Sequence, residues 1–326
     1  MSLPLSGFLS TYYGIQVEEK LWFDSKEAYR DGNYFYFITS IDNREIIFME
    51  QASLSYYLMD YEVKHVTLPI PNLQGEWITP FHDKNYLVMR VSELNHDRYT
   101  SDGIALANFH HIGSNYQYQP KEISSYGAWK TLWINKLTIF ETKIKDEAKN
   151  NPCDYYKLLM DLLPYLVGIS ENAIQYIRET ETENRFHEVD QGSITFNRYK
   201  NQLIQPILWS EDLVYDHPTR DIAEYIRSFM LVEDDGNDIS TFLQDYQYIR
   251  PLSIFSLRLI YARLLFPIHW FDLINRGFME ENLDQLYLDL RELADKQVTY
   301  ERALKEFFEI NGVRTEDLDI PVINWL

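Results

Sequence analysis

The stretch GSITFNRYKNQLIQPILWSEDLVYDHPTRDIAEYIR, residues 192–227, decides the fold of this 326-residue chain. Its Gly, Asn, Gln and Pro residues interrupt a pattern that is mostly helical from residue 103 onward, and they predict loops and short strands over 190–215. A helix is predicted to follow at 220–230, with Asp221 in its first turn, where an acid interacts favourably with the helix dipole. The stretch is therefore predicted to be an irregular segment set into a helical region.

The second half of this stretch, DHPTRDIA at 216–223, resembles the D-P-x-x-D-L-A segment of aminoglycoside phosphotransferases and choline kinases. In those families, an H-G-D-x-x-x-x-N loop orients the substrate hydroxyl, and an I-D-[FW] strand holds magnesium. The corresponding loop here is SITFNRYKN, residues 193–201, and the magnesium position falls on or near Trp209. The resemblance implies a kinase scaffold without its catalytic carboxylates, because phosphoryl transfer needs those charges and an indole offers magnesium no oxygen ligand.

The chain is identified as a member of the CotS-like family of spore coat proteins, and within it of the YutH-like branch. The similarity covers most of residues 100–275 and is weaker in the first 90 and the last 50. Further residues that carry it are GIALANFH (103–110), Trp129, Trp133, YIRPLS (248–253) and RLIYARLLFPIHW (258–270). Membership implies a bilobal protein-kinase-like fold of the α+β class and a link to the spore coat, with other coat proteins as partners.

The resemblance also gives Asp221 a structural role. In the superfamily, this acid begins a helix of the large lobe and accepts backbone hydrogen bonds from the catalytic loop. Asp221 is retained here together with Pro218 and Ala223. A retained scaffold without its chemistry is typical of a pseudokinase, and we expect Asp221 to be buried and bonded to the backbone near 195–199.

Hydrophobic periodicity and turn residues predict a strand-rich N-lobe at 1–92 and a mostly helical C-lobe at 93–326, joined by a hinge at 92–102. In the N-lobe, we expect a short helix within 9–17, a helix at 44–61 capped by Asn43, and strands at 34–39, 66–71, 77–79 and 86–91. In the C-lobe, we expect helices near 102–113, 121–149, 153–163, 167–181, 220–230, 240–246, 252–276, 279–295 and 299–311. Gly312 is a plausible stop for the last of these.

Composition limits the classes of partner. The formal net charge of −20 repels phosphate backbones and anionic lipid headgroups, so we expect neither nucleic acid nor a membrane as partner. The most apolar stretch, 257–274, contains two arginines and an aspartate, and predicts a buried helix pair broken at Pro267 rather than a membrane span. The single Cys153 excludes an intrachain disulfide, and residues 1–11 do not resemble a signal peptide. Together with the resemblance, this predicts synthesis in the cytoplasm and assembly into the coat.

The N-lobe lacks the residues that hold ATP in a kinase. No lysine occurs between Lys26 and Lys64, so the strand at 34–38 has no lysine for the α- and β-phosphates. Gly32 is the only glycine between residues 14 and 75, which excludes a glycine-rich phosphate loop. Glu45 and Glu50 lie on the following helix without a lysine to pair with, and we expect both to be solvated surface charges.

The C-lobe offers few alternatives. Asn201 corresponds to a second-metal asparagine, although a turn Asn is the simpler interpretation. Glu211 and Asp212 are the acids nearest to the magnesium position, and Asp212 approaches it if the alignment slips by two or three residues. His217 lies between two acids, but a turn histidine bonded to the backbone is the expected role. His110 and His111 are adjacent on a helix and cannot form a metal pair.

We therefore assign no catalytic, cofactor-binding or metal-binding residue, and we expect no cofactor. The favoured hypothesis is an inactive kinase-like protein that acts in sporulation by association with other coat proteins. The first alternative is an active or atypical phosphotransferase that uses Mg-ATP on a small hydroxyl compound. The second is a module that binds a ligand without a nucleotide in the cleft between the lobes.

Overall fold

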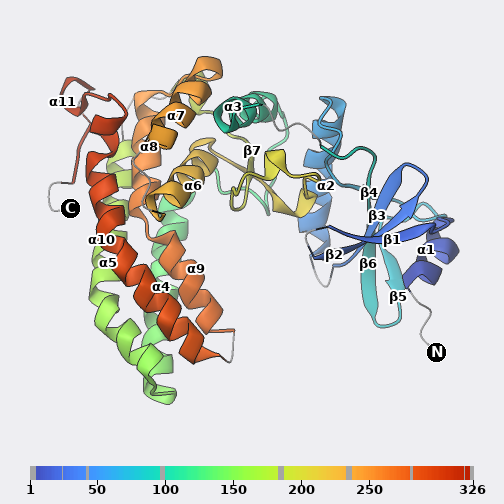
Figure 1. The fold of residues 1–326 in the computed structure, drawn as a ribbon, viewed down its shortest axis with the longest axis horizontal. Coiled ribbons are helices and arrows are strands. Elements are labelled where there is room, and N and C mark those ends of the chain that lie inside the picture. The colour runs from blue at the N-terminus through green and yellow to red at the C-terminus, as the bar shows by residue number, and fades with distance from the viewer. Residues whose placement is uncertain are drawn as a thin grey trace.

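The computed structural model describes residues 5–23, 25–41, 44–95, 100–182, 187–232, 237–279, 282–318 and 320–323. An antiparallel sheet lies toward the N-terminal end of the molecule, long helices lie toward the other end, and a small two-stranded sheet lies between them (Figure 1). This is a bilobal α+β fold, as the sequence predicts. The predicted Asn43 cap and residues 96–99 of the predicted hinge lie outside the described residues, so the lobe boundary at 92 stays a prediction.

Six strands form the main sheet, in the order β1-β2-β3-β6-β4, with β5 also paired to β6 and every pairing antiparallel. Helix α2 follows β3 in the chain and α1 precedes β1. The bounds of these elements are α1 Leu5–Tyr13, β1 Glu19–Phe23, β2 Lys26–Asp31, β3 Tyr34–Ser40, α2 Glu45–Asp60, β4 Leu68–Ile70, β5 Thr79–Phe81 and β6 Lys84–Val91.

The sequence patterns predict β3, β4 and β6, but the strand predicted at 77–79 shares only residue 79 with β5, and β1 and β2 are not predicted. Strand β1 is at the sheet edge and most of its residues are exposed, so its pairing with β2 stabilises it rather than a buried apolar face. In β3, the alternation of side chains sends Tyr36 to one face, where α1 packs, and Phe37 to the other. The second face is therefore the one that is available to contact the helical region.

The helical region contains α3 Asp102–Gly113, α4 Trp129–Asn150, α5 Asp154–Glu181, α6 Thr219–Met230, α7 Asn237–Ile249, α8 Ile254–Leu265, α9 Ile268–Gly277, α10 Leu283–Ile310 and α11 Thr315–Leu318. Helix α3 has the predicted bounds, and the side chain of Ser101 caps it by accepting the amide of Ile104. Gly312 follows α10 with φ of +67°, which confirms the predicted stop.

Three predicted helix boundaries are wrong. Helix α4 begins at Trp129 and not at 121, because residues 123–125 exchange backbone hydrogen bonds with Tyr215 instead. The predicted helices at 153–163 and 167–181 are one helix, α5, in which Pro164 is tolerated while one side of the helix is buried in the core. The predicted helices at 279–295 and 299–311 are also one helix, because Tyr300 is buried in mid-helix and donates to the Leu264 carbonyl.

The apolar stretch at 257–274 forms α8 and α9, which are separated at Pro267 as predicted. By length and composition alone, Ile254–Gly277 is apolar enough to cross a membrane, but 78% of its most apolar window is buried inside the fold. A core helix of a globular protein passes the same test, so the length and composition of this segment are weak evidence of a membrane span.

The irregular segment predicted at 190–215 contains strands β7 Ser193–Phe196 and β8 Leu213–Asp216, which pair antiparallel. Helix α3 packs directly on β7. A Cβ atom at Gly113 would lie 2.6 Å from Ser193 Oγ and 2.7 Å from the Ile194 nitrogen, so only glycine allows this approach. The two strands thus present the 197–212 loop toward α2 and the sheet (Figure 1).

Candidate functional site

Asp221 holds the start of the loop in place. Its side chain is fully buried, and both carboxylate oxygens lie 3.1 Å from the Phe196 amide, which donates to them. His110 Nε2 lies 3.0 Å from Asp221 Oδ2, while its Nδ1 lies 2.9 Å from the Tyr246 hydroxyl. Burial raises the pKa of Asp221 and lowers the pKa of His110, which favours the neutral form of the histidine. The expected architectural geometry is confirmed.

Asp216 connects three further elements to the same loop. The buried carboxylate accepts hydrogen bonds from Ser125 Oγ at 2.7 Å, Trp129 Nε1 at 2.8 Å and Arg220 Nη1 at 2.7 Å. Arg220 also donates to the Asn197 carbonyl at 2.9 Å. No motif indicates this role of Asp216, which ends strand β8 four residues before Arg220 in the first turn of α6.

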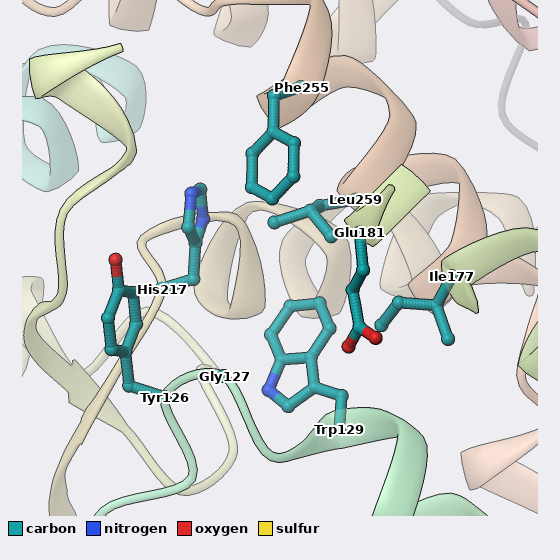
Figure 2. Close-up of a pocket in the computed structure, with 8 residues that line it drawn as sticks. All are labelled: Tyr126, Gly127, Trp129, Ile177, Glu181, His217, Phe255 and Leu259. Carbon is teal, nitrogen blue, oxygen red and sulfur yellow. The ribbon is translucent and has the colours of Figure 1, made fainter. Parts of the chain in front are cut away.

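His217 is a turn residue, as expected. Its Nδ1 accepts the Thr219 amide at 3.2 Å, and its Nε2 lies 3.6 Å from Asp190 Oδ1. Burial lowers the pKa of the His217 ring. Figure 2 shows His217 beside Tyr126 and Trp129 around a cavity of about 180 Å³, with Phe255 and Leu259 of α8 on its other side. Apart from His217, the Tyr126 hydroxyl and the Glu181 carboxylate, the side chains that line it are apolar, and the carboxylate would repel a phosphate.

An indole and an ammonium group lie at Trp209, the position that the sequence resemblance predicts to correspond to the magnesium site. The ring of Trp209 meets Phe37 of β3 edge-on, with 4.8 Å between centroids. Lys26, at the start of β2, places Nζ 4.0 Å from the Trp209 ring centroid and also pairs with Glu211. Within the described residues, no group of three or more His, Cys, Asp or Glu side chains is placed to hold a metal ion. The residues present therefore do not fit magnesium.

The other acid of this loop is Asp212. Burial and the neighbouring Glu211 raise the pKa of the Asp212 carboxyl, while Lys26 opposes the shift. The Asp212 backbone carbonyl accepts the Asn197 amide at 2.7 Å, which ties the two ends of the loop together. Asp212 thus lies near the interface of the lobes with a pKa that favours protonation more than that of an ordinary aspartate.

Asn201 occupies a turn. It has φ of +58°, and its Nδ2 donates to Asp102 Oδ2 at the start of α3 over 3.1 Å. The Tyr225 hydroxyl donates to the same oxygen at 2.8 Å. These contacts hold the nitrogen of the Asn201 side-chain amide, whereas its Oδ1, the atom that would bind a metal, is buried without a hydrogen-bond partner. The positive φ agrees with the interpretation of Asn201 as a turn asparagine.

Apolar side chains fill the space between the sheet and the loop. Phe37, Met89 and Val91 are buried in one cluster with Ile207, and Trp209 packs against it. The segment before Trp209 is also paired to the N-lobe through its backbone. Thr67 donates to the Leu208 carbonyl and the Leu208 amide donates to the His65 carbonyl, each at 2.9 Å. The loop is therefore fixed to the sheet side by both packing and hydrogen bonds.

Helix α2 makes direct contacts to the helical region, and the prediction for Glu50 is wrong. Its carboxylate accepts three consecutive backbone amides, those of Lys121, Glu122 and Ile123, at 2.7, 2.9 and 3.1 Å. The next residue, Gln51, donates to the Glu211 carbonyl at 2.8 Å. Residues 121–123 are predicted to be helical, but they lie outside α4, so their backbone amides are free to donate to the Glu50 carboxylate. Glu45 remains partly exposed in the first turn.

An antiparallel sheet with α2 after its third strand, fixed to a helical region through the 206–212 segment, defines a kinase-like fold. Solved structures with this fold include an aminoglycoside phosphotransferase from Alicyclobacillus acidocaldarius, with a TM-score of 0.62 and 12% identity over 95% of this chain and 97% of that one. A microcompartment-associated aminopropanol kinase gives a TM-score of 0.58 and 11% identity over 94% and 98%. At such identities, the likeness shows the fold alone.

The family follows from sequence. The chain belongs to the family described as "Spore coat putative kinase YutH", which matches residues 6–307. It is 30% identical over 334 residues to the endospore coat-associated protein YutH of Bacillus subtilis (strain 168), and the match covers 99% of this chain and 98% of that protein. The predicted membership of the YutH-like branch is confirmed.

Proposed function

We propose that this protein is a catalytically inactive kinase-like protein that acts in the spore coat by association with other coat proteins. One observation carries the proposal. The position where the superfamily holds magnesium contains the Trp209 indole and the Lys26 ammonium group, and Lys26 already pairs with Glu211. A magnesium ion there would have to displace this ammonium and would meet an aromatic ring instead of oxygen ligands.

The packing of the cleft supports the same conclusion. Phe37 lies on the strand where a kinase carries its phosphate-binding lysine, and its ring is buried against Trp209. Opening this contact to admit a triphosphate would expose two aromatic side chains, and burying a large apolar side chain is worth about 1.5–3 kcal/mol. The net charge of −20 also disfavours the approach of a triphosphate.

The proposed location and mode of action rest on the similarity to the B. subtilis relative. The B. subtilis relative carries the description endospore coat-associated, and a family member of nearly equal length is expected to have the same location. We infer synthesis in the cytoplasm, followed by assembly into the coat. An inactive scaffold in such an assembly would act by binding, and its partners would be other coat proteins rather than nucleic acid or lipid.

An active or atypical phosphotransferase is the alternative, and Asp212 is the observation that favours it. Its carboxyl is close to Glu211 and Lys26 at the interface of the lobes, and its raised pKa is a feature of some catalytic acids. A second alternative is a ligand held in the same cleft without a nucleotide, for which an aromatic ligand against Trp209 would be the expected occupant.

A thermal unfolding experiment with Mg-ATP separates these functions. If ATP binds the folded protein, a hundredfold excess over Kd adds about 2.7 kcal/mol. With about 2.1 cal/mol/K of unfolding entropy per residue, that is a rise in Tm of roughly 4 °C for a chain of this length. We expect Mg-ATP to raise Tm no more than a control of magnesium and sodium chloride at the same ionic strength. A rise of that size that disappears in Asp212→Ala would favour the phosphotransferase.

A further inference from the structure

A second cavity, of about 220 Å³, lies beside the one in Figure 2 and shares Trp129 with it. Its chemistry differs from that of its neighbour, because four basic side chains line it and no Asp or Glu side chain does. The basic residues are Lys136, Arg198, Arg220 and Arg263, and Ser125 and Trp129 also line the cavity. A basic cavity is unexpected in a chain with a net charge of −20.

The cations around this cavity exceed the carboxylates that pair with them. Arg198 forms a two-point pair with Asp272, with both N–O distances 3.0 Å. Arg263 and Arg227 share the single carboxylate of Glu224, at 3.2 and 3.0 Å. Arg220 pairs with Asp216, as described above.

Lys136 has no such partner. In the part of the chain that the structure describes, its ammonium group makes no ion pair. It makes a cation–π contact with Phe140, with 5.2 Å between Nζ and the ring centroid. Burial and the nearby Arg198 lower the pKa of Lys136, although Asp272 opposes this. Among the described residues, the Lys136 ammonium group therefore adds a positive charge to the cavity that forms no ion pair with a carboxylate.

Two of the guanidinium groups also have unused donors. Arg220 and Arg263 are only 8% and 6% exposed, and the Nε atom of each is buried without a hydrogen-bond partner. Burial together with the charge of Arg220 lowers the pKa of Arg263 to about 9, which reflects the repulsion between them. An anion between these groups would relieve that repulsion and add charge-assisted hydrogen bonds to the guanidinium groups.

We propose that this cavity binds a small molecule that carries a phosphate group. Arginine forks match the oxygens of a phosphate, and several convergent cations favour a doubly charged group over a carboxylate. Ile268, the first residue of α9, also lines the cavity, so the N-terminal end of that helix adds partial positive charge. The volume is below that of drug-sized sites, which suits inorganic phosphate or a small phosphate ester rather than a nucleotide.

Inorganic phosphate is the probe, titrated into the full-length protein by calorimetry at constant ionic strength, without magnesium or nucleotide. We expect saturable binding with a one-to-one stoichiometry. Lys136→Gln removes the unpaired ammonium group from a half-buried position, and we expect it to weaken binding about tenfold, equivalent to about 1.4 kcal/mol. Arg198→Gln is a second variant with the same expectation.

Lys145→Gln is the matched control. It removes the same charge from the same helix, α4, but from an exposed position outside the cavity, and its affinity should stay within a factor of about two of the wild type. No saturable heat with phosphate, equal weakening by Lys145→Gln, or equally tight binding of acetate would overturn the proposal. The site uses no nucleotide, so phosphate binding is a result separate from the Mg-ATP experiment.

Discussion

Replacing Asp221 with alanine tests whether the retained acid supports the scaffold. The carboxyl bonds to two buried polar groups, the Phe196 amide and His110 Nε2, and each buried polar group left unsatisfied costs about 1–3 kcal/mol. Part of that loss is offset, because the variant no longer buries the carboxyl whose pKa is raised by desolvation. We expect a net destabilisation of about 3 kcal/mol, which corresponds to a Tm lower by roughly 4 °C for a chain of this length.

The assay is thermal unfolding followed by circular dichroism, with two comparison variants. Asp221→Asn retains an acceptor for the Phe196 amide and should lose less than half as much stability. Asp238→Ala removes an exposed acid from the first turn of α7 and should cost at most about 1 kcal/mol, the usual value of a helix-dipole interaction. An Asp221→Ala protein that melts within 1 °C of the wild type, where about 4 °C is expected, would refute the structural role.

Three further predictions concern the rest of the fold. Burial lowers the pKa of His269 to about 3, so protonation of the ring below about pH 6.5 lowers the free energy of unfolding. In urea titrations, His269→Gln should reduce the loss of unfolding free energy between pH 7 and 5 by roughly 2 kcal/mol. Gly113→Ala should destabilise by about 1–3 kcal/mol through its clash with Ser193, whereas Gly168→Ala, with open space around its Cβ, should stabilise by up to about 1 kcal/mol. Glu50→Ala should cost about 1–3 kcal/mol in the same melts, because three backbone amides lose their acceptor.

Local patterns explain which elements could be predicted from the sequence. Helix α3 has a Ser cap, and β3 and β6 are apolar and aromatic runs in which consecutive residues are buried, so their signals lie within each segment. Strands β1 and β2 depend on pairing with each other, and the start of α4 depends on competition from Tyr215, which is distant in sequence. Tertiary contacts of this kind leave no local pattern.

The candidate site was also predictable only where its signal lies within one segment of the chain. The position of Asp221 and the aromatic residue at the magnesium position follow from spacing within one segment. The contact between Lys26 and Trp209 joins residues that are far apart in the chain, and the pairing of His110 with Asp221 does so too. No sequence motif specified the partner of His110.

Calorimetric titration of Mg-ATP into the protein at physiological salt tests the central claim most directly. The claim is that Trp209, Lys26 and Phe37 occupy the places where a kinase binds metal and phosphates. Because three anchors are missing at once, the account predicts no saturable, magnesium-dependent heat. A Kd in the micromolar range that is lost in Asp212→Ala would contradict it, and would identify Asp212 as the metal ligand of an active phosphotransferase.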